Sequence, residues 1–366
     1  MTLKILALGG DGIGPEVVAA AIRVLDVAAH SIDLDFDLSE DLLHGAAWEK
    51  YACFIRPQTL DKAKASDALL VGATGGPAWD HIVIDGGPEE QDGLMKLRHE
   101  LDVFACVRHA RAWDALLDKT PFRAQTVRGA DLVVMRELCG GAMFTRTRGR
   151  ETRADGSQRA FDLNEYSSAE IERFARVGFE VARRRRSKVV SVDKANVFIA
   201  GKLWREVVDE IGKSEFPDVE LTHFYADNAN YQLCCHPTAF DVILADNLFG
   251  DLLSDQSAAI AGSLGMLPSA SLADLPRTGR VQGTAIYEPV HGSAPDIAGR
   301  GIANPVGMIL SLAMMLEYTA GEVNCARKIE GAVDAALNMG HATRDIGGTL
   351  GTEAMTDAVI AQFRAL

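Results

Sequence analysis

Two aspartates four residues apart, Asp251 and Asp255, are the side chains whose type and spacing point most directly to chemistry. They lie in the stretch NLFGDLLSD (247–255), which begins a predicted helix. Residues i and i+4 share a helix face, so both carboxylates point the same way. Two like charges this close need a positive partner, and Mg²⁺ commonly binds one or two carboxylates together with a substrate. Solvated helix carboxylates, with Asp255 as a cap, explain the same spacing, so both interpretations stay open here.

Apolar runs that alternate with helical patterns surround this pair and predict an α/β protein with a largely parallel sheet. Strands are predicted at 3–8, 68–72, 103–107, 131–135, 188–192 and 241–245. Helices are predicted at 15–29, 93–100, 167–185, 201–212, 250–264, 305–319 and 322–338. The polar segment 143–166 fits either a disordered loop or a protruding β arm, because threonines alternate with arginines there.

Composition limits the class of protein. The chain has 366 residues, which at about 150 per domain predicts roughly two domains. A net charge of −14 disfavours a nucleic-acid partner, because phosphate contacts need a basic surface. The run Arg183 to Arg186 is the exception, and it ends a helical pattern where cations complement the helix dipole.

Cysteine spacing and apolar run lengths predict the compartment. None of the six cysteines forms a C-x-x-C pair or a zinc pattern, so they are interpreted as free thiols of a reducing environment. The first ten residues resemble a strand that leads into a glycine turn, not a signal peptide. No apolar stretch approaches membrane-spanning length. We therefore predict a cytoplasmic protein without a membrane partner.

The glycine turn after the first strand, GDGIG (10–14), invites a dinucleotide-binding interpretation. The G-x-G-x-x-G fingerprint needs its third glycine one position later, where Pro15 stands instead. Pro15 suits the first position of a helix. The turn can still approach a cofactor closely, but a Rossmann fold is not predicted.

Eight stretches along nearly the whole chain form an ordered set of motifs. They are GDGIGPEV (10–17), GATGGP (72–77), RELCGG (136–141), SVDKANV (191–197), NLFGDLLSD (247–255), GMLPSASL (265–272), EPVHGSAPDIAG (288–299) and IANP (302–305). In this order they resemble the β-decarboxylating dehydrogenases, the isocitrate and isopropylmalate dehydrogenase family, and most closely its isopropylmalate branch. Members oxidise different 2-hydroxy acids, so the family is better defined than the substrate.

The resemblance implies an isopropylmalate dehydrogenase-like two-domain fold that is not a Rossmann fold. A large cofactor-binding α/β domain would comprise residues 1–103 and 262–366, and residues 104–261 would form a dimerisation and substrate domain. The segment 143–166 would then be an intersubunit β arm. A homodimer with shared active sites is implied.

The implied reaction is the NAD- and metal-dependent oxidation of a 3-substituted, alkyl malate, followed by loss of the 3-carboxylate as CO₂. Arginine binds carboxylates bidentately, and Arg136 directly follows a buried strand, where a guanidinium needs an anionic partner. The apolar pair at 94–95 suits an alkyl substituent. The substrate residues implied by the resemblance are Arg98, Arg108, Arg136, Asn196, Leu94 and Met95.

Lys194 and Asp227 match the family's catalytic lysine and a third metal-binding aspartate. The resemblance places both on the partner subunit, facing Asp251 and Asp255. A positioned lysine suits proton transfer, and Mg²⁺ or Mn²⁺ would polarise the substrate oxygen.

Cofactor contacts are implied for the loop 288–304 and two glycine-rich turns. An acidic residue at Asp296, followed by Ile297, goes with NAD in the family, and the carboxylate would repel the 2′-phosphate of NADP. The implied cofactor residues are Ile13, Thr74, Glu288, His291, Gly292, Ser293, Ala294, Asp296, Ile297 and Asn304.

Three positions depart from the family pattern. Met143 stands where the family has a catalytic tyrosine, and a thioether cannot donate a proton. His109 replaces a proline, and Gln91 replaces an acidic residue. The loss of the tyrosine raises the alternative of a paralogue with a changed substrate or altered decarboxylation instead of an ordinary leucine-pathway enzyme. A tartrate- or D-malate-type dehydrogenase and a catalytically weakened regulatory member remain alternatives.

Overall fold

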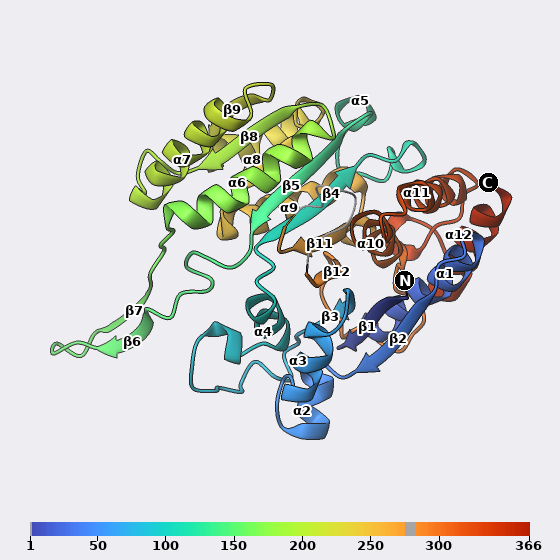
Figure 1. Ribbon diagram of the computed structural model, residues 1–366, viewed down its shortest axis with the longest axis horizontal. Helices are drawn as coiled ribbons and strands as arrows, with labels where there is room; N and C mark the ends of the chain where they lie inside the picture. The colour runs from blue at the N-terminus through green and yellow to red at the C-terminus, as the bar shows by residue number, and fades with distance from the viewer. Residues whose placement is uncertain (1, 275–282) are drawn as a thin grey trace.

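One large sheet runs through the protein, as seen in a computed structural model that describes residues 2–274 and 283–366 (Figure 1). Ten strands have the order β2-β1-β3-β12-β11-β4-β5-β10-β8-β9. Both outer parts of the sheet are parallel, and three antiparallel pairs, β12–β11, β11–β4 and β4–β5, join them. The strands are β1 (Leu3–Gly10), β2 (Phe36–Asp41), β3 (Ala68–Ala73), β4 (Ala105–Arg111), β5 (Asp131–Glu137), β8 (Lys188–Asp193), β9 (Glu220–Tyr225), β10 (Val242–Ala245), β11 (Pro268–Leu272) and β12 (Ala285–Pro289).

Helices cover both faces of this sheet. Strands β3, β10, β11 and β12 are buried along their whole length, as expected for strands with helices on both sides. The longer helices are α1 (Gly14–Ser31), α4 (Gly93–Glu100), α6 (Ser168–Arg183), α7 (Ile199–Glu215), α8 (Ala226–Cys235), α9 (Asn247–Ala261), α10 (Val306–Met315), α11 (Val323–Asn338) and α12 (Thr352–Ala365), with shorter ones at α2 (Gly45–Tyr51), α3 (Pro57–Lys64) and α5 (Ala124–Val127). Among the described residues, no helix is long and apolar enough to cross a membrane.

The two ends of the chain pack together. Helix α1 contacts α10 and α12, and α11 contacts both α10 and α12, so the blue and red segments lie side by side in Figure 1. Helices α6 and α7 pack on each other at the opposite part of the sheet. The α/β fold with a mainly parallel sheet is therefore confirmed.

Most predicted elements form, with shifts that have local causes. The predicted strand 103–107 lies at Ala105–Arg111, and the predicted helix 250–264 begins at Asn247. This helix starts earlier because Asp246 is its N-cap and accepts a hydrogen bond from Phe249 N at 2.8 Å. Asp255 therefore lies within the helix, and the expectation that it caps a helix is wrong.

The polar segment after β5 forms a β arm. Strands β6 (Arg148–Thr152) and β7 (Gln158–Asp162) pair antiparallel in a separate two-stranded sheet that projects from the body (Figure 1). The alternation of threonine and arginine thus indicates a ribbon, and the alternative of a disordered loop is wrong.

The four consecutive arginines have structural partners. Arg183 pairs with Asp218, and Arg185 donates to Asp131 and Asp241 at 2.8 Å each. Helix α6 ends at Arg183, so the run lies at the C-terminus of a helix as predicted. All six cysteines are free thiols.

Candidate active site

Three elements bring arginines and carboxylates together at one end of the central strands. Arg108 on β4 donates from Nη1 to Ser254 Oγ at 2.6 Å and lies 3.5 Å from both Asp251 Oδ1 and Asp255 Oδ1 on α9. Arg136 on β5 forms an ion pair with Asp251. Arginines therefore supply the positive charge beside the two aspartates, Arg108 next to both carboxylates and Arg136 next to Asp251. Two predicted substrate residues and two predicted metal residues thus form one cluster.

Close packing of α9 on β5 fixes this arrangement. A Cβ at Gly250 would lie 2.7 Å from Arg136 Cβ, so the helix can approach the strand only with glycine there. Asn247, at the start of the helix, accepts from Arg136 Nε at 2.9 Å and donates to Gly140 O at 3.0 Å. The Asn247 amide, held by Gly140, thus orients the Arg136 guanidinium through its Nε.

Electrostatics distinguish the members of the cluster. Burial and the neighbouring Arg108 lower the pKa of Arg136 to about 10. Burial also raises the pKa of Asp255, and the nearby Asp251 adds to the effect. Arg98 on α4 donates to Glu288 at 2.7 Å, and the charge of Glu288 outweighs burial and raises the pKa of Arg98. In the described part of the chain, Nε of Arg98 and Nε of Arg108 are buried without a hydrogen-bond partner.

Lys194 and Asp227 lie elsewhere and form an ion pair with each other. Lys194 follows β8, and Asp227 is in the first turn of α8. Within residues 2–274 and 283–366, no three His, Cys, Asp or Glu side chains are grouped to hold a metal ion. One protomer therefore does not bring Asp227 to Asp251 and Asp255, and a role for Asp227 at that cluster would require a second subunit.

The loops after β1, β3 and β12 meet at the carboxyl ends of these strands, where predicted cofactor residues converge. Ile13 N donates to Ser293 O at 2.8 Å, and Ser293 Oγ donates to Gly75 O at 2.7 Å, next to Thr74. Gly12 has φ +57°, and a Cβ there would collide with the Ser293 carbonyl. The tight glycine turn is thus required by close approach of the loop 288–304.

His291 in this loop has a nitrogen available for a ligand. Its Nδ1 lies 2.9 Å from Gly292 O and its Nε2 is buried without a partner among the described residues. Burial lowers the pKa of His291, so the ring is neutral. Because Nδ1 must donate to the carbonyl, Nε2 is left as an acceptor, which fits an amino group such as that of adenine.

The other predicted cofactor residues differ in whether their polar groups are already bonded within the protein. Asp296 is exposed, and within the described residues its carboxylate takes part in no ion pair. Glu288 is buried and engaged by Arg98. The amide of Asn304 donates to Asp345 at 2.9 Å and accepts from Val306 N at 3.0 Å, so it holds the start of α10. Gly292, Ala294 and Ile297 lie in the same loop.

Of the two apolar residues predicted to contact an alkyl substituent, only one has exposed surface. Leu94 is buried in a core cluster with Leu6, Leu8 and Leu43, whereas Met95 is partly exposed. Asn196 is exposed two residues after Lys194. Of the predicted pair, Met95 is the side chain with surface left for a substrate.

The departures from the family pattern have different surroundings. Met143 Sδ lies 3.4 Å from Arg136 Nη2, within the arginine cluster. Gln91 hydrogen-bonds with Ile84 across its own loop. His109 points away from the site, because neighbours on a strand face opposite sides, and its Nε2 lies 2.7 Å from Asp131.

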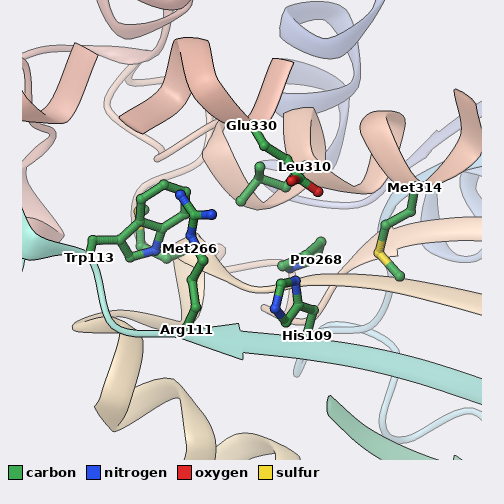
Figure 2. A pocket seen from close by; sticks show the side chains of 8 residues that line it. All are labelled: His109, Arg111, Trp113, Met266, Pro268, Leu310, Met314 and Glu330. Carbon is green, nitrogen blue, oxygen red and sulfur yellow. The ribbon is translucent and has the colours of Figure 1, made fainter. Parts of the chain in front are cut away.

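His109 lines a small cavity on the other face of β4. Figure 2 shows His109 and Arg111 directed from β4 towards Leu310, Met314 and Glu330 of the covering helices. The cavity measures about 20 Å³, enough for one water molecule. His109 therefore faces the covering helices and not the arginine cluster.

Sequence reasoning missed several residues of the site. Ser254 and Asn247 lie in the same motif as the aspartates but became recognisable only through their bonds to the arginines. Asp11 was hidden inside the glycine turn, where its carboxylate accepts from Gly75 N at 2.9 Å and lies 2.8 Å from His44 Nδ1.

Comparison with known proteins agrees with this geometry. The family model described as isocitrate/isopropylmalate dehydrogenase matches residues 4–359. The 3-isopropylmalate dehydrogenase of Pseudomonas fluorescens is 48% identical over 370 residues, covering 100% of both chains. That of Xanthomonas euvesicatoria is 48% identical, covering 99% of each.

Solved structures show the same fold. A crystal structure of isocitrate dehydrogenase from Methylococcus capsulatus has a TM-score of 0.86 at 32% identity, covering 99% of this chain and 100% of its own. The apo form of a β-decarboxylating dehydrogenase from Thermococcus kodakarensis has a TM-score of 0.78 at 32% identity, covering 100% and 97%.

Proposed function

The chain belongs to the isocitrate/isopropylmalate dehydrogenase family, and we propose that within it the protein oxidises and decarboxylates a 3-alkylmalate, using NAD and Mg²⁺ or Mn²⁺. The relatives named 3-isopropylmalate dehydrogenase support this substrate class. The partly exposed Met95 beside Arg98 on α4 supports an apolar C3 substituent.

The buried arginine cluster is the observation that carries the proposal. Arg108 and Arg136 lie against two helix carboxylates, and the charge of Arg98 acts on Arg136 from the neighbouring helix α4. Arg98 and Arg108 have buried, unpartnered Nε groups in the described structure. A malate carries two carboxylates, which can satisfy such donors bidentately. Leaving the donors without a ligand would cost the desolvation of each group.

Asp251 and Asp255 fit a divalent cation, because both carboxylates lie on one face of α9 and the Asp255 side chain is 58% exposed. When bound, the metal would supply polarisation of the substrate's C2 oxygen and NAD would accept the hydride. Arg98, Arg108 and Arg136 would hold the two carboxylates, and Lys194 of the second subunit would take the hydroxyl proton.

NAD is proposed as the cofactor because the exposed carboxylate of Asp296, which has no ion pair within the described residues, can accept hydrogen bonds from ribose hydroxyls and repels a 2′-phosphate. The acceptor Nε2 of His291 in the same loop supports an adenine site. Residues 1–103 and 262–366 would form the cofactor-binding domain and residues 104–261 the substrate and dimer domain, as the packing of both chain ends supports.

The proposed activity predicts NADH formation from 3-isopropylmalate or another 3-alkylmalate, in the presence of Mg²⁺ or Mn²⁺. Initial rates should be compared across 3-alkylmalates, D-malate, tartrate and isocitrate, each with NAD and with NADP. We expect the highest kcat/KM with an alkylmalate and NAD. A preference for NADP would contradict the role of Asp296, and no NADH from any substrate would indicate a regulatory member.

A homodimer with shared active sites is proposed from an exposed apolar surface around Lys194 and the aspartates. This surface consists of Val197, Phe198, Ile199, Tyr225, Tyr231, Leu248 and Leu252, which are exposed although large and hydrophobic. Leu248 and Leu252 alternate with Asp251 and Asp255 on α9, so covering them would bring a second chain next to the carboxylates. Exposed large apolar side chains gathered on the elements that carry these residues are typical of an interface, and a second copy is the occupant that supplies the missing Lys194 and Asp227.

Subunit mixing tests the shared site. Lys194→Ala and Asp251→Asn proteins should each be inactive, and mixing them should restore activity. One site of the heterodimer then contains only intact residues, so equal mixing predicts recovery up to about a quarter of the wild-type rate per site under random exchange. Exchange should be confirmed with two differently tagged subunits. No recovery in confirmed heterodimers would show that each site lies within one chain.

One observation favours a second candidate function. Met143 lies against Arg136 where the family has its tyrosine, so a tartrate- or D-malate-type substrate that is oxidised without obligatory decarboxylation is the alternative. The same substrate comparison separates the two, because D-malate or tartrate would then exceed every alkylmalate in kcat/KM.

A further inference from the structure

A buried histidine, His44, bridges two carboxylates that belong to different parts of the proposed site. Its Nδ1 lies 2.8 Å from Asp11 Oδ2, and its Nε2 lies 3.6 Å from Asp92 Oδ2. The ring stacks on Phe54 with centroids 4.6 Å apart and meets the edge of Trp79 at 6.0 Å. Aromatic walls therefore hold the imidazole in place between the two acids.

The backbone of His44 is strained. Its φ is 54° and its ψ is −125°, a combination that normally requires glycine. Such strain persists only where surrounding contacts compensate for it. The contacts of the histidine side chain with the two acids and the two aromatic rings supply this compensation.

Asp11 and Asp92 each hydrogen-bond to a different segment of the proposed site, Asp11 to loops of the cofactor side and Asp92 to the helix of the substrate side. Asp11 accepts from the backbone N of Gly45, Ala46 and Gly75 at 3.2, 2.9 and 2.9 Å, so it joins the glycine turn after β1 to the loop after β3. Asp92 caps α4 by accepting from Leu94 N at 2.7 Å and Met95 N at 3.0 Å. Helix α4 carries Arg98 of the arginine cluster.

The charges around His44 favour its protonated form. Burial by itself lowers the pKa of His44, but the hydrogen bond with Asp11 and the charges of Asp92, Asp11 and Asp80 outweigh it, so the pKa is raised. These three aspartates come from the turn after β1 and from the loop between β3 and α4. An imidazolium donates from both nitrogens, so it can serve both carboxylates at once.

We propose that His44 is a positioning residue that couples the cofactor turn to the substrate helix by lying as a cation between Asp11 and Asp92. The proposal deepens the proposed function and rests on it for the identity of the two ligands. With His44 protonated, the turn that meets Ser293 and the helix that carries Met95 and Arg98 are held at a fixed separation. When His44 loses its proton, the attraction between Nε2 and the Asp92 carboxylate is lost, while the hydrogen bond from Nδ1 to Asp11 remains.

The coupling predicts effects on binding, not on the chemical step. His44→Gly should raise the KM for both NAD and alkylmalate about tenfold, with kcat changed less than about threefold, because a lost contact between binding elements removes uniform binding, which raises KM without lowering kcat. In wild type, both KM values should increase as the pH rises through the raised pKa of His44. This increase should be absent in His44→Gly. His81→Asn, an exposed histidine of the neighbouring loop, is the matched control and should behave as wild type.

Asp92→Asn gives a second, independent variant. Asparagine is as good an N-cap as aspartate, so the variant keeps α4 while removing the charge that faces His44. If the two groups act as one clamp, the double variant His44→Gly/Asp92→Asn should raise the KM values no more than either single variant does. Fully additive effects, or unchanged KM values in His44→Gly, would overturn the proposal.

An NMR titration of the histidine ring separates this proposal from the proposed function, because it needs no substrate. The His44 resonance, assigned by its absence in His44→Gly, should titrate above about 6.5 in wild type and lower in Asp92→Asn. NAD binding, followed by quenching of tryptophan fluorescence, should weaken in His44→Gly even if no alkylmalate is turned over. A His44 pKa at or below the ordinary value would overturn the proposal whatever the enzyme's substrate proves to be.

Discussion

Replacing Asp251 by asparagine is expected to lower kcat by about 10³-fold or more while leaving the fold intact, because charge stabilisation by a bound metal is worth several kcal/mol and about 1.4 kcal/mol is tenfold. The variant keeps an oxygen that can accept from Arg136, so the ion pair with Asp251 becomes a hydrogen bond and is not lost. What disappears is the negative charge beside Asp255. Initial rates at saturating Mg²⁺ and alkylmalate measure the effect.

A control substitution and a stability measurement show whether a loss of activity in Asp251→Asn comes from the site or from unfolding. Asp26→Asn, an exposed aspartate on α1 far from the cluster in sequence, removes the same charge and should leave kcat unchanged. Circular dichroism and the melting temperature of Asp251→Asn should match wild type in the absence of metal. Near-normal turnover at saturating Mg²⁺ would show that Asp251 is a structural partner of Arg136 and not a metal ligand.

Introducing tyrosine at Met143 is expected to accelerate formation of the final ketone relative to hydride transfer. The hydroxyl proton must leave for hydride transfer, a role proposed for Lys194, whereas the enolate formed after CO₂ loss must be protonated by an acid. Met143 cannot supply that proton, although its sulfur lies 3.4 Å from the Arg136 guanidinium. General acid catalysis contributes roughly 10²–10⁴-fold, so the wild-type enzyme should show slow protonation or oxidation without obligatory decarboxylation.

Single-turnover traces of NADH, CO₂ and the final ketone from an alkylmalate measure this effect. Wild type should form NADH before the final ketone, and Met143→Tyr should shorten the interval. Met143→Phe is the matched control, because it adds the ring without the hydroxyl and should resemble wild type. If wild type already forms the final ketone as fast as it forms NADH, without an intermediate, another acid has replaced the tyrosine and the prediction is wrong.

The sequence by itself determined the fold class, the family and most of the longer elements. Helix α4 occupies the predicted residues 93–100, and strand β5 begins at the predicted Asp131, because a local pattern of apolar residues and caps dictates both. Three of the strands that it missed have weak local patterns, whereas helix α12 (Thr352–Ala365) was missed despite its buried face. Strand β2 (FDLSED) and strand β9 (ELTHFY) lie at the edges of the sheet, are partly exposed, and mix charged with apolar residues. Strand β11 (PSASL) is short and made of small residues that only burial identifies as a strand.

In the candidate site, too, some features follow from the sequence and others only from the tertiary structure. The i, i+4 spacing of Asp251 and Asp255 was readable from the chain, because helical geometry fixes which side chains share a face. The positions of Arg108 beside both aspartates and of Arg136 beside Asp251 depended on the packing of α9 on the paired strands β4 and β5, which joins residues more than a hundred positions apart. His44 carries no local sign of a role, since neither of its acids is near it in sequence. Only the tertiary structure could place it, because burial and charge proximity arise from packing between distant segments and not from any pattern along the chain.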